Sequence, residues 1–185
     1  MPAQPMRRRF TVKEYRRMGK AGILAADERV ELIEGEIIQM PPIGGQHAAR
    51  VNRVSRLFHR TVGDASIISV QNPVQLSDRS EPVPDLMLLR PRDDFYETHP
   101  TARDVLLLVE VSDTTLAYDK GVKLQLYARE GIPEVWILDL PHRVLHVHRE
   151  PAAAGYQTRL TLGHGDRFSP LAFPNLELAV EDIVG

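Results

Sequence analysis

Two short apolar stretches of the chain each carry an acidic residue, and this combination constrains the fold more than any other feature. Residues 84–89 read PDLMLL, with Asp85 near the start, and residues 105–112 read VLLLVEVS, interrupted by Glu110. Apolar runs of this length are typical of buried β-strands. A buried carboxylate costs several kcal/mol unless a cation or hydrogen-bond donors compensate it. The two acids therefore predict a divalent metal site in the middle of a sheet.

Size and composition limit the class of protein. With 185 residues, 43% hydrophobic and 26% charged, we expect one globular domain over residues 1–185. No apolar run approaches membrane-spanning length, and no apolar stretch follows the basic N-terminal residues, so we expect neither a membrane partner nor a secretory signal. The chain has no cysteine, which excludes disulfides and a thiol nucleophile and favours a cytoplasmic location.

The net charge of −2 argues mildly against tight non-specific DNA binding but allows a local basic face. Between residues 46 and 62 apolar residues recur at helical spacing, and four arginines lie largely off that stripe. Two interpretations stay open for these arginines, namely a solvated helix face and a face that contacts DNA phosphates. The four residues are Arg50, Arg53, Arg56 and Arg60.

The order of expected elements predicts an α/β fold, with a mixed β-sheet flanked by helices. A hairpin is expected over 29–40, with Glu34-Gly35 at its turn. The region 90–103 is polar, carries two prolines and is expected to be a loop. Further strands are expected at 66–70, 73–77, 85–89, 105–111, 134–140, 143–148 and 156–162, and a further helix at 118–130.

Asp85 and Glu110 would lie side by side if their strands are neighbours. Oxygen ligands of this kind suit Mg²⁺ or Mn²⁺. Hydrolysis of a phosphodiester needs a deprotonated water, stabilised charge on phosphorus and a neutralised leaving oxygen. The metal serves all three needs, and a nearby lysine helps with the first two.

The helix after Glu110 offers two lysines for this role. Lys120, Lys123 and Tyr127 are three and four residues apart, which places them on one face of a regular helix. Either lysine would reach the metal site if the helix begins beside the end of the Glu110 strand. The alternative is that Asp119 and Lys123 form an ordinary surface ion pair.

A second alternative concerns His146 and His148, which share one face of the expected strand. With His164 they would form a transition-metal site. An exposed, polar strand face is the interpretation that we favour for this pair.

Six segments, in this order, resemble the Uma-type restriction-endonuclease-like family, a branch of the PD-(D/E)XK nuclease superfamily. The resemblance covers residues 10–180. The segments are ELIEGEI at 31–37, His47, VPDL at 83–86, LVEVS at 108–112, YDKGVKLQLY at 118–127 and GIPEVWILD at 131–139.

The resemblance implies a restriction-endonuclease-like core in which Asp85 and Glu110 hold Mg²⁺ or Mn²⁺. The main-chain carbonyl of Val111 would add a ligand. The superfamily places its lysine two residues after the second acid, and here that position is Ser112. In the related family a lysine from the following helix serves instead, and Lys123 is the matching position.

Four further residues match positions of the family. Lys120 is the second choice for the catalytic lysine. Glu34 matches a recurrent acid near the N-terminal hairpin and would hold a metal-bound water. Tyr127 and His47 match supporting positions of the site.

The function expected from the resemblance is a divalent-metal-dependent endonuclease that hydrolyses DNA phosphodiester bonds. A single active site cuts one strand, so a double-strand cutter would be a homodimer. The alternative is a catalytically degenerate module that keeps the nuclease fold and binds nucleic acid or another protein.

Overall fold

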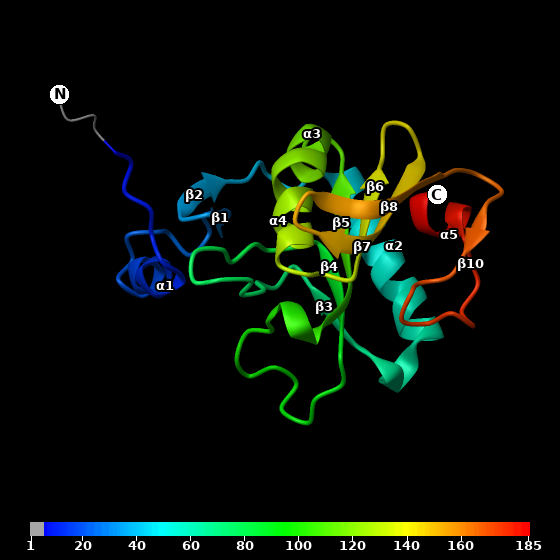
Figure 1. The fold of residues 1–185 in the computed structure, drawn as a ribbon, viewed down its shortest axis with the longest axis horizontal. Coiled ribbons are helices and arrows are strands. Elements are labelled where there is room, and N and C mark those ends of the chain that lie inside the picture. Colours follow the sequence, from blue (N-terminus) through cyan, green and yellow to red (C-terminus); the bar gives the residue numbers. More distant parts are fainter. Residues whose placement is uncertain (1–5) are drawn as a thin grey trace. The chain divides into compact units, whose positions relative to one another are not determined.

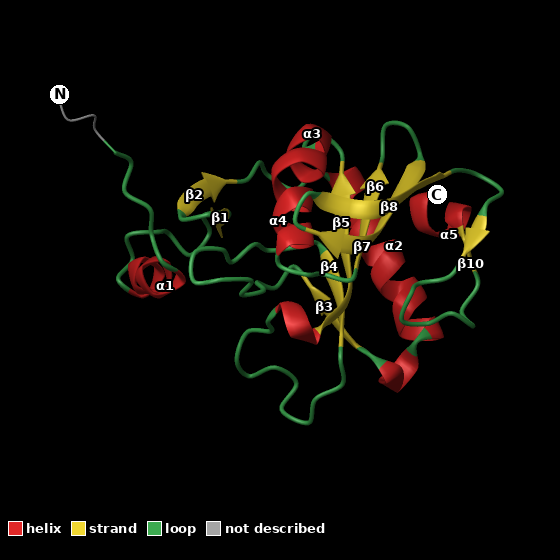
Figure 2. Cartoon of the chain, in the orientation of Figure 1, coloured by secondary structure: helices red, strands yellow, loops and turns green. Residues whose placement is uncertain are grey.

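The computed structural model describes residues 6–185. Its chain divides into two compact units, of which unit 1 comprises residues up to Pro42 together with Gln75–Pro82. Unit 2 comprises Ile43–Val74 and Val83–Gly185. Figure 1 labels the elements, and Figure 2 distinguishes helices, strands and loops. Since one domain can contain two such units, the single domain over 1–185 stays a prediction.

Unit 1 contains a helix and the predicted hairpin. Helix α1 (Val12–Lys20) begins with a capping box between Thr11 and Glu14. Strands β1 (Val30–Ile33) and β2 (Glu36–Gln39) pair antiparallel.

The tight hairpin turn requires left-handed backbone at both of its residues. Glu34 has φ 51° and Gly35 has φ 81°. A Cβ on Gly35 would lie 2.6 Å from the Cβ of Arg9, so a glycine is needed there.

Unit 2 is built on a six-stranded sheet in the order β3-β4-β5-β6-β7-β8. Only β5 and β6 pair parallel, and the other neighbours are antiparallel, which confirms the mixed sheet. The strands are β3 (Ile67–Val70), β4 (Leu86–Leu89), β5 (Val105–Ser112), β6 (Glu134–Asp139), β7 (Val144–Ala152) and β8 (Gly155–Leu162).

The strand expected over 73–77 does not form; Ser77 makes only an isolated bridge with Ser80. The N–H groups of Leu76 and Ser77 instead donate to the Ser80 carbonyl across a local turn, so they do not pair with a neighbouring strand. At the C-terminal end two short strands, β9 (Arg167–Phe168) and β10 (Leu178–Ala179), pair with each other. Short 3₁₀ turns lie at Gly63–Ala65 and Ala102–Asp104.

Helices cover both faces of the unit 2 sheet. Helices α2 (Gly45–Thr61) and α5 (Val180–Val184) pack on the face that carries Val109 and Trp136. On this face the rings of Phe58 and Trp136 lie 5.6 Å apart.

Because side chains alternate along a strand, Glu110 and Ser112 point to the opposite face. The helical segment that covers this face consists of α3 (Leu116–Tyr118), a π-helical turn (Asp119–Lys123) and α4 (Leu124–Arg129). No helix in the described part of the chain is long and apolar enough to cross a membrane.

Candidate active site

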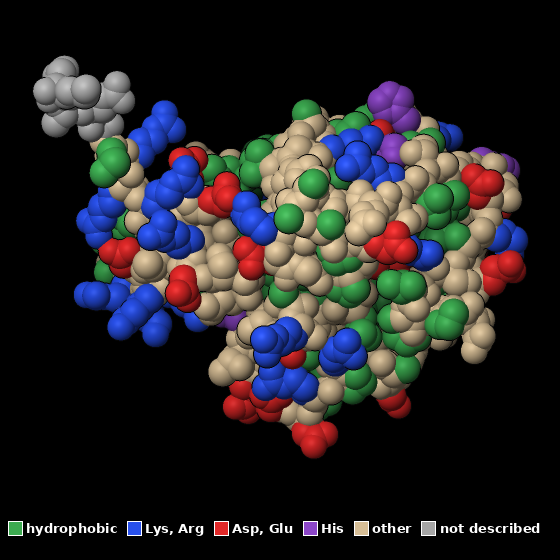
Figure 3. Space-filling model, in the orientation of Figure 1, with side chains coloured by type: hydrophobic (Ala, Val, Ile, Leu, Met, Phe, Trp, Pro, Cys, Tyr) green, Lys and Arg blue, Asp and Glu red, His purple; other side chains and the backbone are tan. Residues whose placement is uncertain are grey.

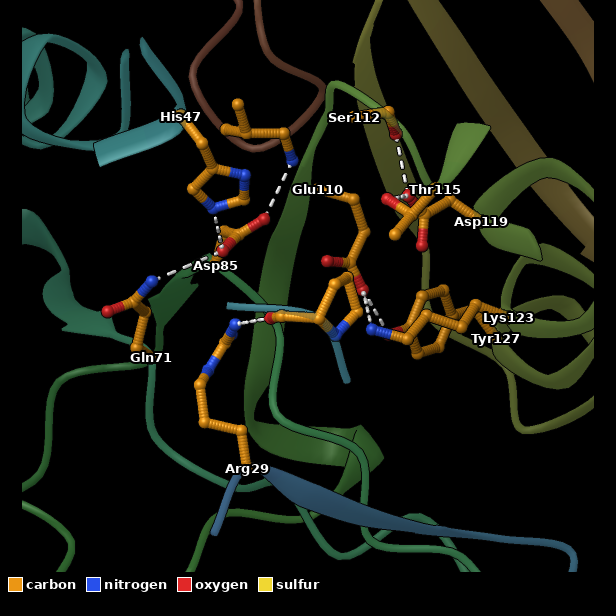
Figure 4. A network of polar contacts seen from close by, with 12 residues as sticks. Arg29, His47, Gln71, Asp85, Glu110, Ser112, Thr115, Asp119, Lys123 and Tyr127 are labelled. Atoms are coloured by element: carbon orange, nitrogen blue, oxygen red, sulfur yellow. Dashed lines mark hydrogen bonds and ion pairs between the residues drawn. The ribbon is translucent and has the colours of Figure 1, made fainter. Parts of the chain in front are cut away.

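The pairing of β4 with β5 brings the two acids together. Leu86 is the register partner of Val109, so Asp85, the residue just before β4, lies opposite Glu110 when the register is continued by one position. The Val111 N–H donates to Asp85 Oδ2 at 2.9 Å. Asp85 is 8% exposed and Glu110 is 3% exposed. The neighbouring positions of β4 and β5 therefore meet the condition under which the two acids would lie side by side (Figure 4).

Asp85 is also held from two other elements of unit 2. His47 Nε2, from the first turn of α2, lies 2.7 Å from Asp85 Oδ1. Gln71, just after β3, donates its Nε2 to the same oxygen at 3.4 Å. His47, predicted as a supporting residue, therefore contacts one of the two acids directly.

Glu110 meets the helical segment through Lys123 and Tyr127. Lys123 Nζ lies 3.1 Å from Glu110 Oε1, and Tyr127 Oη donates to the same oxygen at 2.5 Å. The Lys123 side chain is 2% exposed. A buried ammonium beside a buried carboxylate compensates its charge, whereas either charge alone would be strongly unfavourable.

Lys120 makes a separate set of contacts. Its Nζ lies 2.8 Å from His146 Nε2 and 4.0 Å from Asp139 Oδ2. His142 Nδ1 lies 2.8 Å from Asp139 Oδ1. Burial, together with the positive charge of Lys120, lowers the pKa of His146. Burial alone would raise the pKa of Asp139, but hydrogen bonds from His142 and His146 outweigh it and hold that pKa below its usual value.

The helical segment differs from the regular helix that the spacing predicts. Its middle turn, Asp119–Lys123, is π-helical, so it contains more residues per turn than an α-helix. In a regular helix Lys120 and Lys123 would share a face. Here their side chains meet different partners, Glu110 for Lys123 and His146 for Lys120. The expectation of one shared lysine face is therefore wrong.

Ser112 and Asp119 hold the start of this π-helical turn. Ser112 Oγ donates to Asp119 Oδ2 at 2.7 Å, and Thr115 Oγ1 donates to the same oxygen at 2.7 Å. Asp119 is 3% exposed and Ser112 is fully buried. The alternative of a surface ion pair between Asp119 and Lys123 is wrong, because both residues are buried and Asp119 bonds to the two hydroxyls. Ser112, a short polar residue that ends the Glu110 strand, is the feature of the sequence that could have indicated this contact.

Glu34 belongs to unit 1, whereas Asp85 and Glu110 belong to unit 2. Its N–H donates to Ser80 Oγ at 3.0 Å, and its carbonyl accepts a hydrogen bond from Arg9. A role in holding a metal-bound water stays a prediction.

The α2 arginines lie on the solvent side of their helix, as the pattern predicted. Arg53, Arg56 and Arg60 are exposed and line a groove of about 400 Å³ with Leu57, Thr61 and Asp182. Arg50 is half-buried, and burial lowers its pKa. A role of this face in binding DNA stays a prediction.

The donor atoms of the two acids suit the divalent metal that the resemblance implies. Asp85 and Glu110 offer carboxylate oxygens, and the Val111 carbonyl is a third hard oxygen donor. Among residues 6–185 no group of three or more His, Cys, Asp or Glu side chains is arranged to hold a metal ion. Mg²⁺ keeps several waters and needs only one or two carboxylates, so these residues fit Mg²⁺ or Mn²⁺ better than a metal that needs a complete protein cage.

Comparison with solved structures supports the fold. A crystal structure titled as a putative nuclease belonging to DUF820 from Anabaena variabilis ATCC 29413 matches with a TM-score of 0.72 and 18% sequence identity. The match covers 95% of this chain and 97% of that chain. At this identity the likeness shows a shared fold, which agrees with the nuclease-like core predicted from the sequence.

Comparison with family models supports the membership. No curated protein matches the chain. The model of the Uma2 family, whose description is "Putative restriction endonuclease", matches residues 12–181. The chain therefore belongs to the Uma2 family.

Proposed function

We propose that the protein is a divalent-metal-dependent endonuclease that hydrolyses DNA phosphodiester bonds. The observation that carries this proposal is the convergence of Asp85, Glu110 and Lys123 in unit 2. The two acids occupy opposite register positions at the β4–β5 pairing, and a buried ammonium lies 3.1 Å from Glu110. Membership of a family described as putative restriction endonucleases supports the same conclusion.

Each residue has a stated role in this proposal. Asp85, Glu110 and the Val111 carbonyl would hold Mg²⁺ or Mn²⁺, which when bound supplies Lewis-acid activation of water and of the phosphate. His47 orients Asp85, since it lies 2.7 Å from one carboxylate oxygen.

Lys123 and Tyr127 act from the helical segment. Both keep Glu110 in one orientation through hydrogen bonds to Oε1. The Lys123 ammonium also places positive charge where negative charge develops on the phosphate, a stabilisation that is strongest in a site that excludes water. Lys123 would orient the attacking water with the same group.

A second candidate is a degenerate module that binds nucleic acid or protein without cleaving. Two observations favour it. Both Asp85 oxygens accept hydrogen bonds or contact His47 within the protein, and Glu110 forms a buried pair with Lys123. Such contacts stabilise a fold whether or not a metal binds.

The test is nicking of supercoiled plasmid DNA with and without Mn²⁺ or Mg²⁺. We expect metal-dependent nicking by the wild type and its loss in Asp85→Ala, because that variant lacks a metal ligand. Mn²⁺ binding measured by electron paramagnetic resonance should weaken in the same variant. Asp93→Ala, at an exposed position in the 90–103 loop, serves as the matched control. Identical nicking by wild type and Asp85→Ala would exclude the nuclease and leave the binding module.

DNA as substrate and a homodimer as the cutting form are parts of the same proposal. One active site cuts one strand, so two copies are needed for a double-strand break. Analytical ultracentrifugation with and without a DNA duplex should show a dimer in the active form. A monomer that makes double-strand breaks in a single binding event would contradict this part.

A further inference from the structure

Helix α1 in unit 1 carries a row of basic side chains that the proposed active site does not use. Four of them, Lys13, Arg16, Arg17 and Lys20, line a groove of about 590 Å³. The rest of the groove comes from Thr11, Val12, Gln75 and Asp78, all of which belong to unit 1. Figure 3 shows Lys and Arg side chains gathered over the α1 region.

The charge of this segment contrasts with that of the whole chain. Residues 7–20 contain seven Lys or Arg residues and one acidic residue, Glu14, in a chain of net charge −2. Local potential depends on where charges are placed and not on the net charge alone. The positive charge is therefore concentrated on one short segment.

Three of the four groove residues keep their charge available to a ligand. Arg16 forms an ion pair with Glu81 and donates to Gln75 at 3.1 Å. Lys13, Arg17 and Lys20 are exposed, and none of them takes part in the ion pairs found between described residues. We name these three residues the α1 basic face.

The α1 basic face is held in place by the opposite side of the helix. Val12 is 3% exposed, and Tyr15 Oη donates to the Val30 carbonyl of the hairpin at 2.9 Å. The capping box fixes the first turn. The basic side chains therefore project from a rigid element and not from a flexible tail.

The spacing of the α1 basic face suits a nucleic-acid backbone. Lys13, Arg17 and Lys20 are four and three residues apart, so they lie on one face along about 10 Å of helix axis. Phosphates of one DNA strand repeat about every 3.4 Å along the duplex axis. A row of three cations about 10 Å long therefore runs beside several phosphates of one strand, and long, flexible side chains can reach them.

A membrane surface fits this helix less well. A helix that lies on a membrane buries an apolar face among the lipids. In α1 the apolar Val12 is already buried in the protein, and Tyr15 is bonded to the hairpin. The face left for a partner is basic.

We propose that the α1 basic face binds the phosphate backbone of nucleic acid and anchors the substrate of the nuclease. The proposal rests on the proposed function for the identity of that substrate. Its contacts are independent of sequence, because charges that pair with phosphates carry no base information. The affinity it supplies should depend strongly on salt.

The test measures binding separately from cleavage. The full-length Asp85→Ala protein is titrated with a fluorescein-labelled DNA duplex at several NaCl concentrations, and fluorescence anisotropy gives the dissociation constant. Adding Lys13→Gln, Arg17→Gln and Lys20→Gln should weaken binding at least about tenfold and reduce the slope of log K against log salt by about 3, because three phosphate contacts are lost.

The chain offers two matched controls. Arg103→Gln, Arg143→Gln and Arg159→Gln remove the same charge from three exposed positions of unit 2 outside the α2 arginines, and should leave the salt slope unchanged. Lys13→Arg with Lys20→Arg keeps the charge of the α1 basic face and should keep the salt slope. Thermal melting should show that all these exposed substitutions leave the fold intact.

The outcomes separate this inference from the proposed function. An unchanged slope in the α1 triple variant would overturn the inference, even if the wild type cleaves DNA. Loss of binding to phosphatidylserine vesicles, with DNA binding unchanged, would also overturn it in favour of a membrane. A reduced slope in a protein that never cleaves DNA would uphold the inference and defeat the nuclease.

Discussion

Two charged clusters contact the helical segment 116–129, and they differ in how much water reaches them. In the Glu110 cluster, formed with Lys123 and Tyr127, every residue is at most 3% exposed. In the Asp139 cluster, formed with Lys120 and His146, the Lys120 side chain is 36% exposed. Both clusters pair a carboxylate with a lysine, but only the Glu110 cluster is closed to solvent.

This difference indicates that the fold holds Lys123 in one position and leaves Lys120 freer to change partners. A buried charge must keep its partner because water cannot replace it. An exposed lysine exchanges its partner for water at little cost. The π-helical turn between α3 and α4 assigns the two lysines, three residues apart, to these two environments.

The largest effect expected is that of Lys123→Met compared with Lys120→Met. Lys123→Met should lower the free energy of unfolding by about 3–5 kcal/mol, since it leaves Glu110 buried without the ammonium beside it. Lys120→Met should lower it by less than about 1 kcal/mol. Urea denaturation of both variants measures the contrast. Similar losses of unfolding free energy in Lys123→Met and Lys120→Met would contradict the difference between the two clusters.

An intermediate effect is expected at Asp119, which begins the π-helical turn that carries both lysines. Asp119→Ala removes the acceptor from the buried Ser112 hydroxyl and from Thr115, which should cost about 2–3 kcal/mol. Because Asp119 begins the π-helical turn that ends at Lys123, nicking should also slow, and Asp119→Asn should restore part of it. Asp113→Ala, exposed in the same loop, is the control. If Asp119→Ala loses no more stability than Asp113→Ala, the Ser112–Asp119 contact is not needed to hold the turn.

The smallest effect extends the comparison to the next histidine on the same face of β7. Neither ring nitrogen of His148 has a hydrogen-bond partner among residues 6–185, and burial lowers its pKa from 6.5 to about 4. In the unfolded chain His148 is therefore protonated below about pH 6.5, whereas in the folded protein it stays neutral down to about pH 4. Stability should fall as the pH drops through this window, by about 1–2 kcal/mol between pH 7 and pH 5.

His148→Leu should remove this part of the pH dependence, because leucine does not titrate. Thermal melting of His148→Leu and of His164→Gln, an exposed position, should be followed from pH 7 to pH 5. Equal pH dependence in the two variants would show that His148 is protonated in the folded protein.

Much of the candidate site could be predicted from local sequence. The runs around Asp85 and Glu110 are apolar enough to be strands in any context, and a carboxylate in such a run needs compensation. The hairpin at Glu34-Gly35 was also predictable, because turn chemistry depends on residues close in the chain.

The identity of the lysine beside Glu110 could not be predicted in this way. The spacing of Lys120, Lys123 and Tyr127 indicates one regular helix face, and nothing local in it signals a π-helical turn. That turn coincides with the bond from Ser112, at the end of β5, to Asp119. Such a contact forms only when strand and helix pack against each other.

The sequence by itself determined the strands of the six-stranded sheet, the positions of the two acids beside or within them and the family to which the chain belongs. Only the tertiary structure decided that Asp85 faces Glu110, that Lys123 and not Lys120 meets Glu110, and that Asp119 is buried. The physical reason is the separation along the chain of the residues that interact. Apolar periodicity and turn chemistry act between residues a few positions apart, whereas strand register and burial depend on residues that only the packed sheet brings together.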